Sequence, residues 1–453
     1  MSLANYFLAD LPPGATITPT MITEACQTLK RNRERFLAQR STSHIVGAIA
    51  GIARAWLAPG NPFRRRALEL GPAATGFSQA TLASGLDGFF GSLTQESLHA
   101  LVVQDLGHIE RLDGLSASEH DRRAACAAMA RGPDLLVHIT GGVLPIPAFT
   151  SLVLGLLARS AQFLKCATGT ALLPRLLAHS LYEAEPKLGA CLEIVEWKGG
   201  TEALEAALFA EADCITAMGE DATLAAIRQR VPRHARFLGY GHRVSFGYVA
   251  KGAPAGLNRR GVAAEAAQDV VAWNQLGCLS PHLFYVEMGG SVSPMDFAEA
   301  LADELSACER THPRGPLPPD AAAAIATRRA FYEVRAAHSY DTRQWCSPGS
   351  TAWTVVFEND PKFQASCLNR FVYVKPVPDL EHALQGADAV RGRVSTVGLA
   401  APEQRACALA AELARWGVTR VCRVGQMQAP PLTWRHDGRP ALGDLVTWTD
   451  WES

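Results

Sequence analysis

Apolar and polar positions alternate in two different ways along this chain, and the change between them divides it. In residues 20–58 and 76–103 apolar side chains recur at helical spacing, as Ile22, Leu29 and Phe36 do. From Asp134 onward, short apolar runs rich in β-branched residues alternate with helical segments. We therefore expect a helical N-terminal region over residues 1–105, followed by α/β structure.

The α/β pattern is regular enough to assign strands and helices one by one. Strands are expected at 134–140, 161–165, 192–197 and 214–217, with helices at 149–160, 171–184 and 201–210 between them. Such alternation predicts a parallel sheet covered by helices, and ligands of such sheets bind at the carboxyl ends of the strands. That rule places one group of small and polar residues near a single rim: Thr140, Gly141, Lys165, Thr168, Gly199, Thr216 and Gly219.

The second half of the chain continues the pattern. Strands are expected at 283–287, 352–358, 371–377, 394–399 and 420–424, and helices at 294–308, 320–337 and 402–416. No GxGxxG fingerprint precedes a helix, because the Gly239-Tyr240-Gly241 segment lacks the third glycine. Any nucleotide that binds here does so without that glycine-rich turn.

Composition narrows the class of protein. A chain of 453 residues is too long for one ordinary core, so two or three domains are expected. The formal net charge of −1 and the lack of a basic run with interleaved aromatic residues argue against a nucleic-acid partner. The longest apolar run, 143–158, holds two prolines and is shorter than the roughly 20 residues of a membrane span.

Eleven cysteines are scattered along the chain without a CxxC pair. This usage indicates neither a disulfide framework nor a zinc site, so no metal is expected, and it is typical of a reducing cytoplasm. Only Cys278 and Cys346 stand in turn contexts. The sequence around Cys278 predicts the end of a helix, a turn at Gly277, and then an apolar strand, which favours Cys278 as a nucleophile presented to a cleft. His242 and His282 are candidate bases, but the sequence pairs them with neither thiol.

The segment 269–281, with Gln275 and Gly277-Cys278-Leu279-Ser280-Pro281, resembles the nucleophile segment of the acyl-CoA reductase (LuxC-type) family within the aldehyde dehydrogenase superfamily. Five further segments resemble that family in the same order: 137–140 with its glycine loop, 240–246, 369–371, 374–377 and 436–438. The resemblance implies an aldehyde-dehydrogenase-like α/β fold. Its nucleotide-binding parallel-sheet domain is expected at 106–265, its catalytic domain at 266–430 and a C-terminal tail at 431–453.

The resemblance also implies an activity, the reduction of an acyl thioester to an aldehyde with NADPH. Cys278 would attack the acyl group of a CoA or acyl-carrier-protein thioester, and an acyl-protein ligase or transferase is a further expected partner. Lys165 resembles the superfamily lysine that contacts the adenosine ribose, while Thr216 and Gly219 stand where a second cofactor contact falls. Thr140, Gly141 and Thr168 complete the expected cofactor set, and a homo-oligomer is expected.

Two departures from the superfamily pattern concern the reacting groups. There is no asparagine from 134 to 150 to hold an oxyanion, so backbone N–H groups, including that of Cys278, or the side chain of Asn274 would have to do so. There is no acidic residue from 233 to 257 to activate water, which fits a reductase that protects its acyl-cysteine. Glu287 is retained as a candidate acid or base, with the capping of a strand end as its other role.

Two other functions stay open at this point. A cysteine acyltransferase or thioesterase would use the same thiol without a nucleotide, but it leaves the sheet before Cys278 unexplained. An inactive scaffold that binds an acyl chain would explain the missing asparagine.

Overall fold

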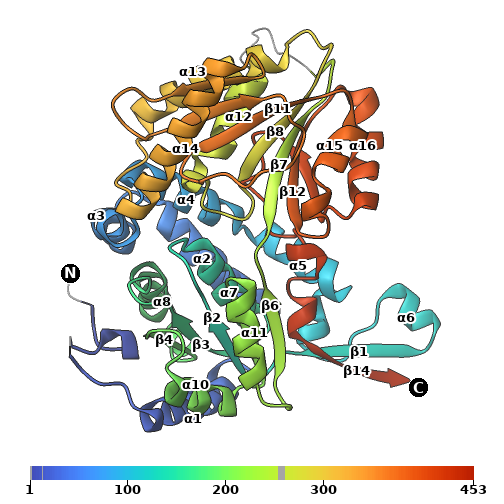
Figure 1. Cartoon of the computed structure of the whole chain (residues 1–453). Helices are drawn as coiled ribbons and strands as arrows, with labels where there is room; N and C mark the ends of the chain where they lie inside the picture. The colour runs from blue at the N-terminus through green and yellow to red at the C-terminus, as the bar shows by residue number, and fades with distance from the viewer. Residues whose placement is uncertain (1–2, 13, 254–260, 453) are drawn as a thin grey trace.

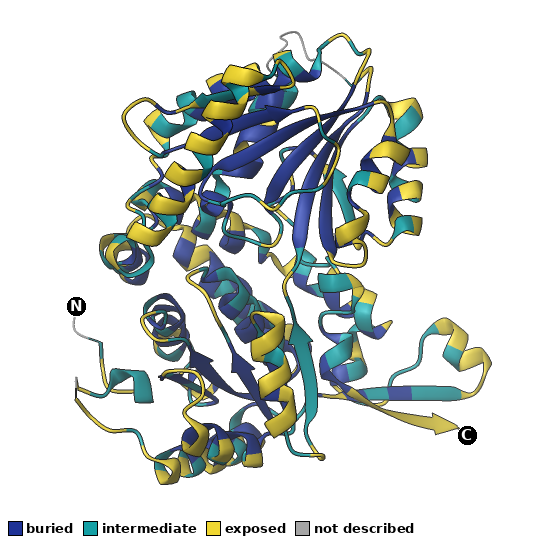
Figure 2. Ribbon diagram, in the orientation of Figure 1, coloured by how far each residue is buried: buried dark blue, intermediate teal, exposed yellow. Residues whose placement is uncertain are grey.

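The computed structural model describes residues 3–12, 14–253 and 261–452, and these residues form two open sheets and one two-stranded ribbon. The smaller sheet lies in the lower half of Figure 1 and the larger sheet in the upper half. The central strands of both sheets are dark blue in Figure 2, whereas the edge strand β6 is teal and the outer faces of the covering helices are exposed. Each sheet therefore supplies the buried centre of its own half.

The smaller sheet is fully parallel, with strand order β4-β3-β2-β5-β6. The order reverses between β2 and β5, which leaves a crevice at the carboxyl ends of these strands. The expected alternation is confirmed, and β6 is an additional strand. The elements are β2 (Leu135–Ile139), α7 (Ile146–Leu157), β3 (Ala161–Cys166), α8 (Leu172–Ala184), α9 (Pro186–Gly189), β4 (Leu192–Glu196), α10 (Glu202–Glu211), β5 (Cys214–Met218), α11 (Asp221–Arg230) and β6 (Arg236–Tyr240).

The larger sheet has the order β13-β12-β7-β8-β11-β10-β9, with only β9 antiparallel to its neighbour. Its first strand, β7 (Val244–Val249), precedes residue 265, so the chain changes sheets earlier than the expected boundary. The other elements are α12 (Gly261–Val271), β8 (Pro281–Glu287), α13 (Pro294–Thr311), α14 (Pro319–His338), β9 (Thr342–Cys346), β10 (Thr354–Glu358), β11 (Phe371–Val377), α15 (Leu380–Gly386), β12 (Val394–Ala400), α16 (Glu403–Trp416) and β13 (Arg420–Arg423).

The helical N-terminal region does not stand apart from the sheets. The helical pattern expected over 20–58 is two helices, because Ser41 accepts a hydrogen bond from the His44 N–H and starts a new one. Helix α1 packs against α10 and β3, and α2 packs against α4 and α7. The helices are α1 (Pro19–Phe36), α2 (Thr42–Leu57), α3 (Pro62–Thr75), α4 (Gln79–Ser92), α5 (Gln95–Leu106) and the short α6 (Glu119–Arg123).

The two ends of the α/β region meet in a ribbon that projects from the body of the molecule (Figure 1). Strand β1 (Cys126–Arg131) pairs antiparallel with β14 (Thr447–Glu452), so the expected C-terminal tail ends as a strand. Arg236 of β6 anchors the preceding segment by donating to the carbonyls of Asp444, Leu445 and Val446. Among the helices of the described residues, none is both long and apolar enough to cross a membrane.

Candidate functional site

Cys278 follows a turn with an unusual backbone. Helix α12 ends in a short 3-10 segment (Ala272–Gln275) in which Trp273, Asn274 and Gln275 all have positive φ, at 51°, 52° and 64°. This conformation costs non-glycine residues free energy, so packing must hold it. The Trp273 ring lies against Gly85 of α4, where a Cβ would come within 2.0 Å of a ring carbon. The helical N-terminal region therefore shapes the turn that presents the thiol.

Buried hydrogen bonds hold the next two residues of this turn. The Gln275 side chain donates to the carbonyls of Pro281 and Phe371 at 2.7 and 2.9 Å and accepts from the Phe371 N–H at 2.9 Å. The Asn274 oxygen accepts from Nε and Nη2 of the fully buried Arg370 at 3.2 and 2.9 Å. The turn is thus bonded to the start of β11.

The amide nitrogen of Asn274 is also engaged, because it donates to the Arg314 carbonyl at 2.8 Å. Both ends of this side chain therefore hold the turn, and the structure does not direct them at an oxyanion beside Cys278. The expectation of a catalytic Asn274 rested on its nearness to Cys278 in sequence. In the structure its side-chain oxygen instead accepts hydrogen bonds from the buried guanidinium of Arg370.

Two loops and strand β7 converge on the Cys278 turn. A Cβ on Gly277 would lie 3.7 Å from Leu144, in the loop after β2, and 3.5 Å from the Gln428 oxygen. Gln428 also donates to the Ser280 hydroxyl at 2.9 Å, and the Ser245 hydroxyl donates to the Cys278 carbonyl at 2.7 Å. Cys278 is an exposed residue, and the nearness of Leu144 to Gly277 places its turn at the junction of the two sheets.

The electrostatic surroundings of Cys278 favour the neutral thiol. The bulk of protein around the cleft, followed by the negative charge of Asp437, raises the pKa of Cys278 to about 11. The N–H groups of Cys278 and Leu279 and the cation of Arg243 act in the opposite direction. Because protein surrounds the sulfur, its anionic form is poorly hydrated. The thiol therefore requires assistance to ionise when substrate binds.

Asp437 and Arg243 are site residues that the sequence pattern did not single out. Their side chains form an ion pair of 3.2 Å, and the side chain of Asp437 is 5% exposed. The neighbouring His436 stacks on Tyr240 at 4.7 Å between ring centroids, which draws the C-terminal segment to the junction. The segments 240–246 and 436–438 both resembled the acyl-CoA reductase family, and that shared resemblance was the available signal.

Glu287 lies at the other end of strand β8. Six residue steps along a strand separate Pro281 from Glu287 by about 20 Å, so the structure does not bring this carboxylate to Cys278. It accepts hydrogen bonds from the Arg405 guanidinium at 2.7 Å twice, from the Tyr248 hydroxyl and from the Lys251 N–H at 2.8 Å. Burial opposes its charge, but the bonds from Arg405 and Tyr248 hold its pKa below the usual range.

The expected cofactor residues lie at the carboxyl ends of the smaller sheet. Lys165, at the end of β3, is buried, and its ammonium lies 4.0 Å from the position of a Cβ on Gly199. Burial lowers the pKa of Lys165, while the nearby charge of Glu205 opposes that shift. Thr168 follows β3, and Gly219, after β5, donates its N–H to the Tyr240 carbonyl at 3.2 Å.

Thr216 differs from this group. Its hydroxyl lies 2.7 Å from His138 Nδ1, and His138 Nε2 lies 3.0 Å from the Gln162 oxygen. Burial lowers the pKa of His138 to about 4, so the ring is neutral and these three side chains form a buried polar link between strands. The Thr216 hydroxyl is therefore used inside the sheet, and only its backbone remains for the rim.

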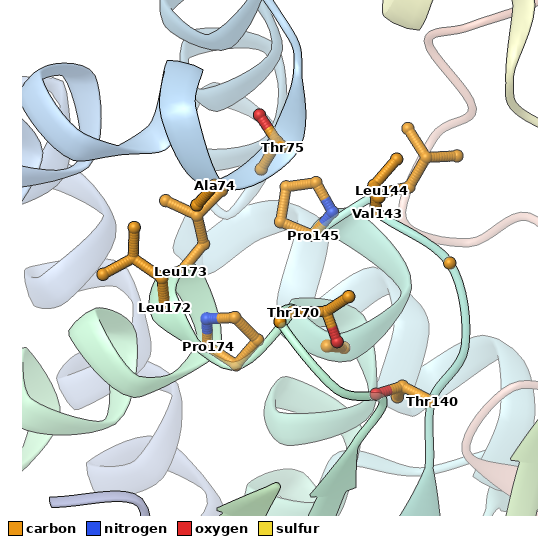
Figure 3. Close-up of a pocket in the computed structure, with 13 residues that line it drawn as sticks. Ala74, Thr75, Thr140, Val143, Leu144, Pro145, Thr170, Leu172, Leu173 and Pro174 are labelled. Atoms are coloured by element: carbon orange, nitrogen blue, oxygen red, sulfur yellow. The ribbon is translucent and has the colours of Figure 1, made fainter. Parts of the chain in front are cut away.

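A pocket opens beside the loop after β2 (Figure 3). Thr140, Gly142 and Leu144 line it from that loop, and Gly169 and Thr170 line it from the segment after β3. Gly142, Gly169 and Gly200 have positive φ, and no atom lies within 4 Å of where their Cβ would stand. The rim therefore has open backbone beside Lys165, as the close approach of a dinucleotide requires.

Comparison with known proteins identifies relatives by sequence. The family model described as acyl-CoA reductase (LuxC) matches residues 37–448. The long-chain acyl-protein thioester reductase of Aliivibrio fischeri is 24% identical over 368 residues, which cover 79% of this chain and 71% of the relative. The long-chain acyl-protein thioester reductase 2 of Photobacterium leiognathi is 22% identical over 364 residues, with the same two coverages of 79% and 71%.

Solved structures share the fold at lower identity. A putative aldehyde dehydrogenase PutA from Anabaena variabilis has a TM-score of 0.70 at 16% identity, over 96% of this chain and 93% of that one. The NAD-dependent benzaldehyde dehydrogenase of Corynebacterium glutamicum has a TM-score of 0.70 at 14% identity, over 97% and 90%. This chain spans 45% of a bifunctional proline utilization A protein, at a TM-score of 0.69 and 15% identity. The fold is thus aldehyde-dehydrogenase-like, and the chain belongs to the acyl-CoA reductase (LuxC) family of oxidoreductases.

Proposed function

We propose that this protein reduces an acyl thioester to an aldehyde with NADPH, through an acyl-cysteine on Cys278. One observation carries the proposal: an exposed cysteine on a rigid turn lies at the junction of the two sheets, with Leu144 of the cofactor-side loop beside Gly277. The glycine-lined edge of the smaller sheet and the thiol-bearing turn of the larger sheet thus lie beside each other. The two relatives, which are named long-chain acyl-protein thioester reductases, support the same substrate class.

The proposed reaction uses the groups of the chain as follows. The Cys278 thiolate attacks the thioester carbonyl, a new carbon–sulfur bond forms, and the carrier thiolate leaves with the electrons of the broken bond. NADPH, held at the rim of the smaller sheet, would supply the hydride that reduces the acyl group on Cys278. The resulting oxyanion re-forms the carbonyl and expels the Cys278 thiolate, which releases the aldehyde. The N–H groups of Cys278 and Leu279, which already favour negative charge on the sulfur, are the nearest donors for that oxyanion.

Lys165 would hold the adenosine end of the cofactor. Its ammonium is buried beside Gly199, where a ribose hydroxyl or a 2′-phosphate can approach, and Thr168 would contribute a hydroxyl from the same segment. Thr140 and Gly141, and the backbone at Thr216 and Gly219, would complete the rim. Lys165→Met is expected to raise the KM for NADPH more than the KM for NADH. An equal change in both KM values would exclude a contact between Lys165 and the 2′-phosphate.

The experiment for the proposed function follows NADPH oxidation with a panel of acyl-CoAs and with an acyl carrier protein thioester. Cys278→Ala is expected to abolish the reaction, whereas Cys346→Ala, at an exposed cysteine three strands away in the same sheet, is expected to retain it. Activity in Cys278→Ala would refute the nucleophile. Acyl turnover that does not depend on NADPH would indicate a transferase or thioesterase, and the absence of an acyl adduct by intact mass would indicate an inactive scaffold.

We also propose that the protein works as a homo-oligomer in the cytoplasm, with its acyl donor delivered by a carrier protein or ligase. The ribbon of β1 and β14 supports an oligomer, because it projects from the body and carries Trp448 and Trp451, which are 42% and 54% exposed. Light scattering on Trp451→Glu is expected to show a smaller particle than the unaltered chain. An unchanged mass would exclude the ribbon as the contact.

A further inference from the structure

The loop after strand β13 is anchored through its own backbone. The buried carboxylate of Asp269, in α12, accepts from the N–H groups of Gly425 and Met427 at 2.6 and 2.9 Å. The Arg420 guanidinium donates to the carbonyls of Gln426 and Met427, both at 2.7 Å. Because both the N–H groups and the carbonyls of this loop are bonded to side chains, the residue that follows Met427 starts from a fixed position.

That residue is Gln428, and its side chain lies against the turn that carries Cys278. The Gln428 Nε2 donates to the Ser280 hydroxyl at 2.9 Å, and its Oε1 lies 3.5 Å from the position of a Cβ on Gly277. Gly277 and Ser280 are the first and last residues of the turn, because the Ser280 N–H donates to the Gly277 carbonyl at 3.0 Å. The amide thus contacts the turn on both sides of Cys278 in sequence.

The loop after β2, which lacks the asparagine of the superfamily pattern, reaches the same glycine. A methyl carbon of Leu144 lies 3.7 Å from the position of a Cβ on Gly277, beside the Gln428 oxygen. Gln428 therefore brings a side-chain amide to the junction that the loop after β2 reaches without one.

Other polar side chains around the turn use their donors elsewhere. Asn274, Gln275 and Ser245 all direct their N–H or O–H donors at backbone carbonyls. A primary amide carries two N–H groups, and the bond from Gln428 to Ser280 uses one of them. Among the residues that the structure describes, Ser280 is the one hydrogen-bond partner of this nitrogen, so its second N–H remains for a ligand.

We propose that the Gln428 amide donates a hydrogen bond to the oxyanion that forms when Cys278 attacks the acyl thioester, in the role of the missing asparagine. This inference rests on the proposed function, and it adds a side-chain donor to the backbone N–H groups of Cys278 and Leu279. As the carbon–sulfur bond forms, an electron pair of the carbonyl moves to its oxygen, and the pair returns when the carrier thiolate leaves. The amide keeps its proton throughout, so it stabilises the oxyanion without activating water.

Replacement of Gln428 by methionine tests the donor, because methionine keeps the length of the side chain and has no N–H. Gln426→Met is the matched control, since Gln426 is exposed in the same loop. Acylation of Cys278 by tetradecanoyl-CoA without NADPH is followed by intact mass, and alkylation by iodoacetamide is followed in parallel. Alkylation forms no oxyanion, so the ratio of the acylation rate to the alkylation rate separates the donor from the reactivity of the thiol. Gln428→Met is expected to lower this ratio about 100-fold, whereas Gln426→Met keeps it within about twofold.

The Ser280→Ala variant separates this role from a structural one. If Gln428 served only to hold the turn through Ser280, then Ser280→Ala and Gln428→Met would lower acylation and alkylation alike, and the proposal would be overturned. The donor role instead requires a much higher ratio in Ser280→Ala than in Gln428→Met. If Gln428→Met does not fold, Gln428→Glu is measured, since an ionised glutamate keeps the shape and has no N–H. An unchanged ratio in the variant that folds would overturn the proposal.

The same rates distinguish this inference from the proposed function. Acylation that depends on Gln428, in a chain that oxidises no NADPH, would support the donor and refute the reduction. Reduction by a Gln428→Met chain whose rate ratio is unchanged would refute the donor alone. An unaltered chain that forms no acyl adduct on Cys278 would overturn both.

Discussion

Replacement of Asn274 by alanine separates a structural from a catalytic role for this side chain. The change removes two hydrogen bonds, of 3.2 and 2.9 Å, from the fully buried guanidinium of Arg370. The guanidinium keeps its bond of 2.7 Å to the Glu309 carboxylate. Hydrogen bonds to a charged group contribute about 1.5–3 kcal/mol, and the two here share one acceptor. Alanine at a φ of 52° adds about 1 kcal/mol, because asparagine tolerates the left-handed region better. The expected loss of unfolding free energy is about 4 kcal/mol.

Urea unfolding followed by tryptophan fluorescence measures this loss. Asn359→Ala is the matched control, because Asn359 is exposed and its side-chain amide donates to the Asp341 side chain. The free energy of unfolding is expected to change there by at most about 0.5–1 kcal/mol. The reasoning would be refuted if Asn274→Ala unfolded like the unaltered chain while its kcat fell about 10²–10³-fold. That combination is the signature of a lost oxyanion donor.

Two further predictions concern the charges at either end of β8. Asp437→Asn is expected to lower the pKa of the Cys278 thiol from about 11, because the Asp437 charge raises that pKa. Iodoacetamide should then alkylate Cys278 faster at pH 8. A slower reaction would contradict the expected direction of the pKa change. Glu287→Gln is expected to lower the melting temperature, since Arg405 loses its buried carboxylate partner, but to leave the alkylation rate of Cys278 unchanged. A changed alkylation rate would contradict the separation of about 20 Å along β8.

Most strands and helices of both sheets were predictable because their signals are local, whereas β6, β7 and β9 were not among the expected strands. An apolar run such as Leu135–Ile139 and a helix such as Leu172–Ala184 are encoded by the spacing of their own side chains. The change of sheets was not predictable in the same way, since β7 has the composition of any buried strand and its partners, β8 and β12, lie far along the chain. The break between α1 and α2 depends on a single capping serine within one long helical pattern.

For the candidate site, local sequence features predicted the thiol and its setting: a turn between a helix and an apolar strand, in a segment that resembles the nucleophile segment of its family. The interactions of the neighbouring polar groups depend instead on contacts between distant parts of the chain. Asn274 is near the thiol in sequence yet bonds to Arg370. Glu287 lies in the strand that follows the thiol yet at its far end, and Asp437 is distant in sequence yet interacts with the thiol. Charges and hydrogen bonds act over a few ångströms of space, and the pairing of strands and helices far apart in the chain decides which groups come that close.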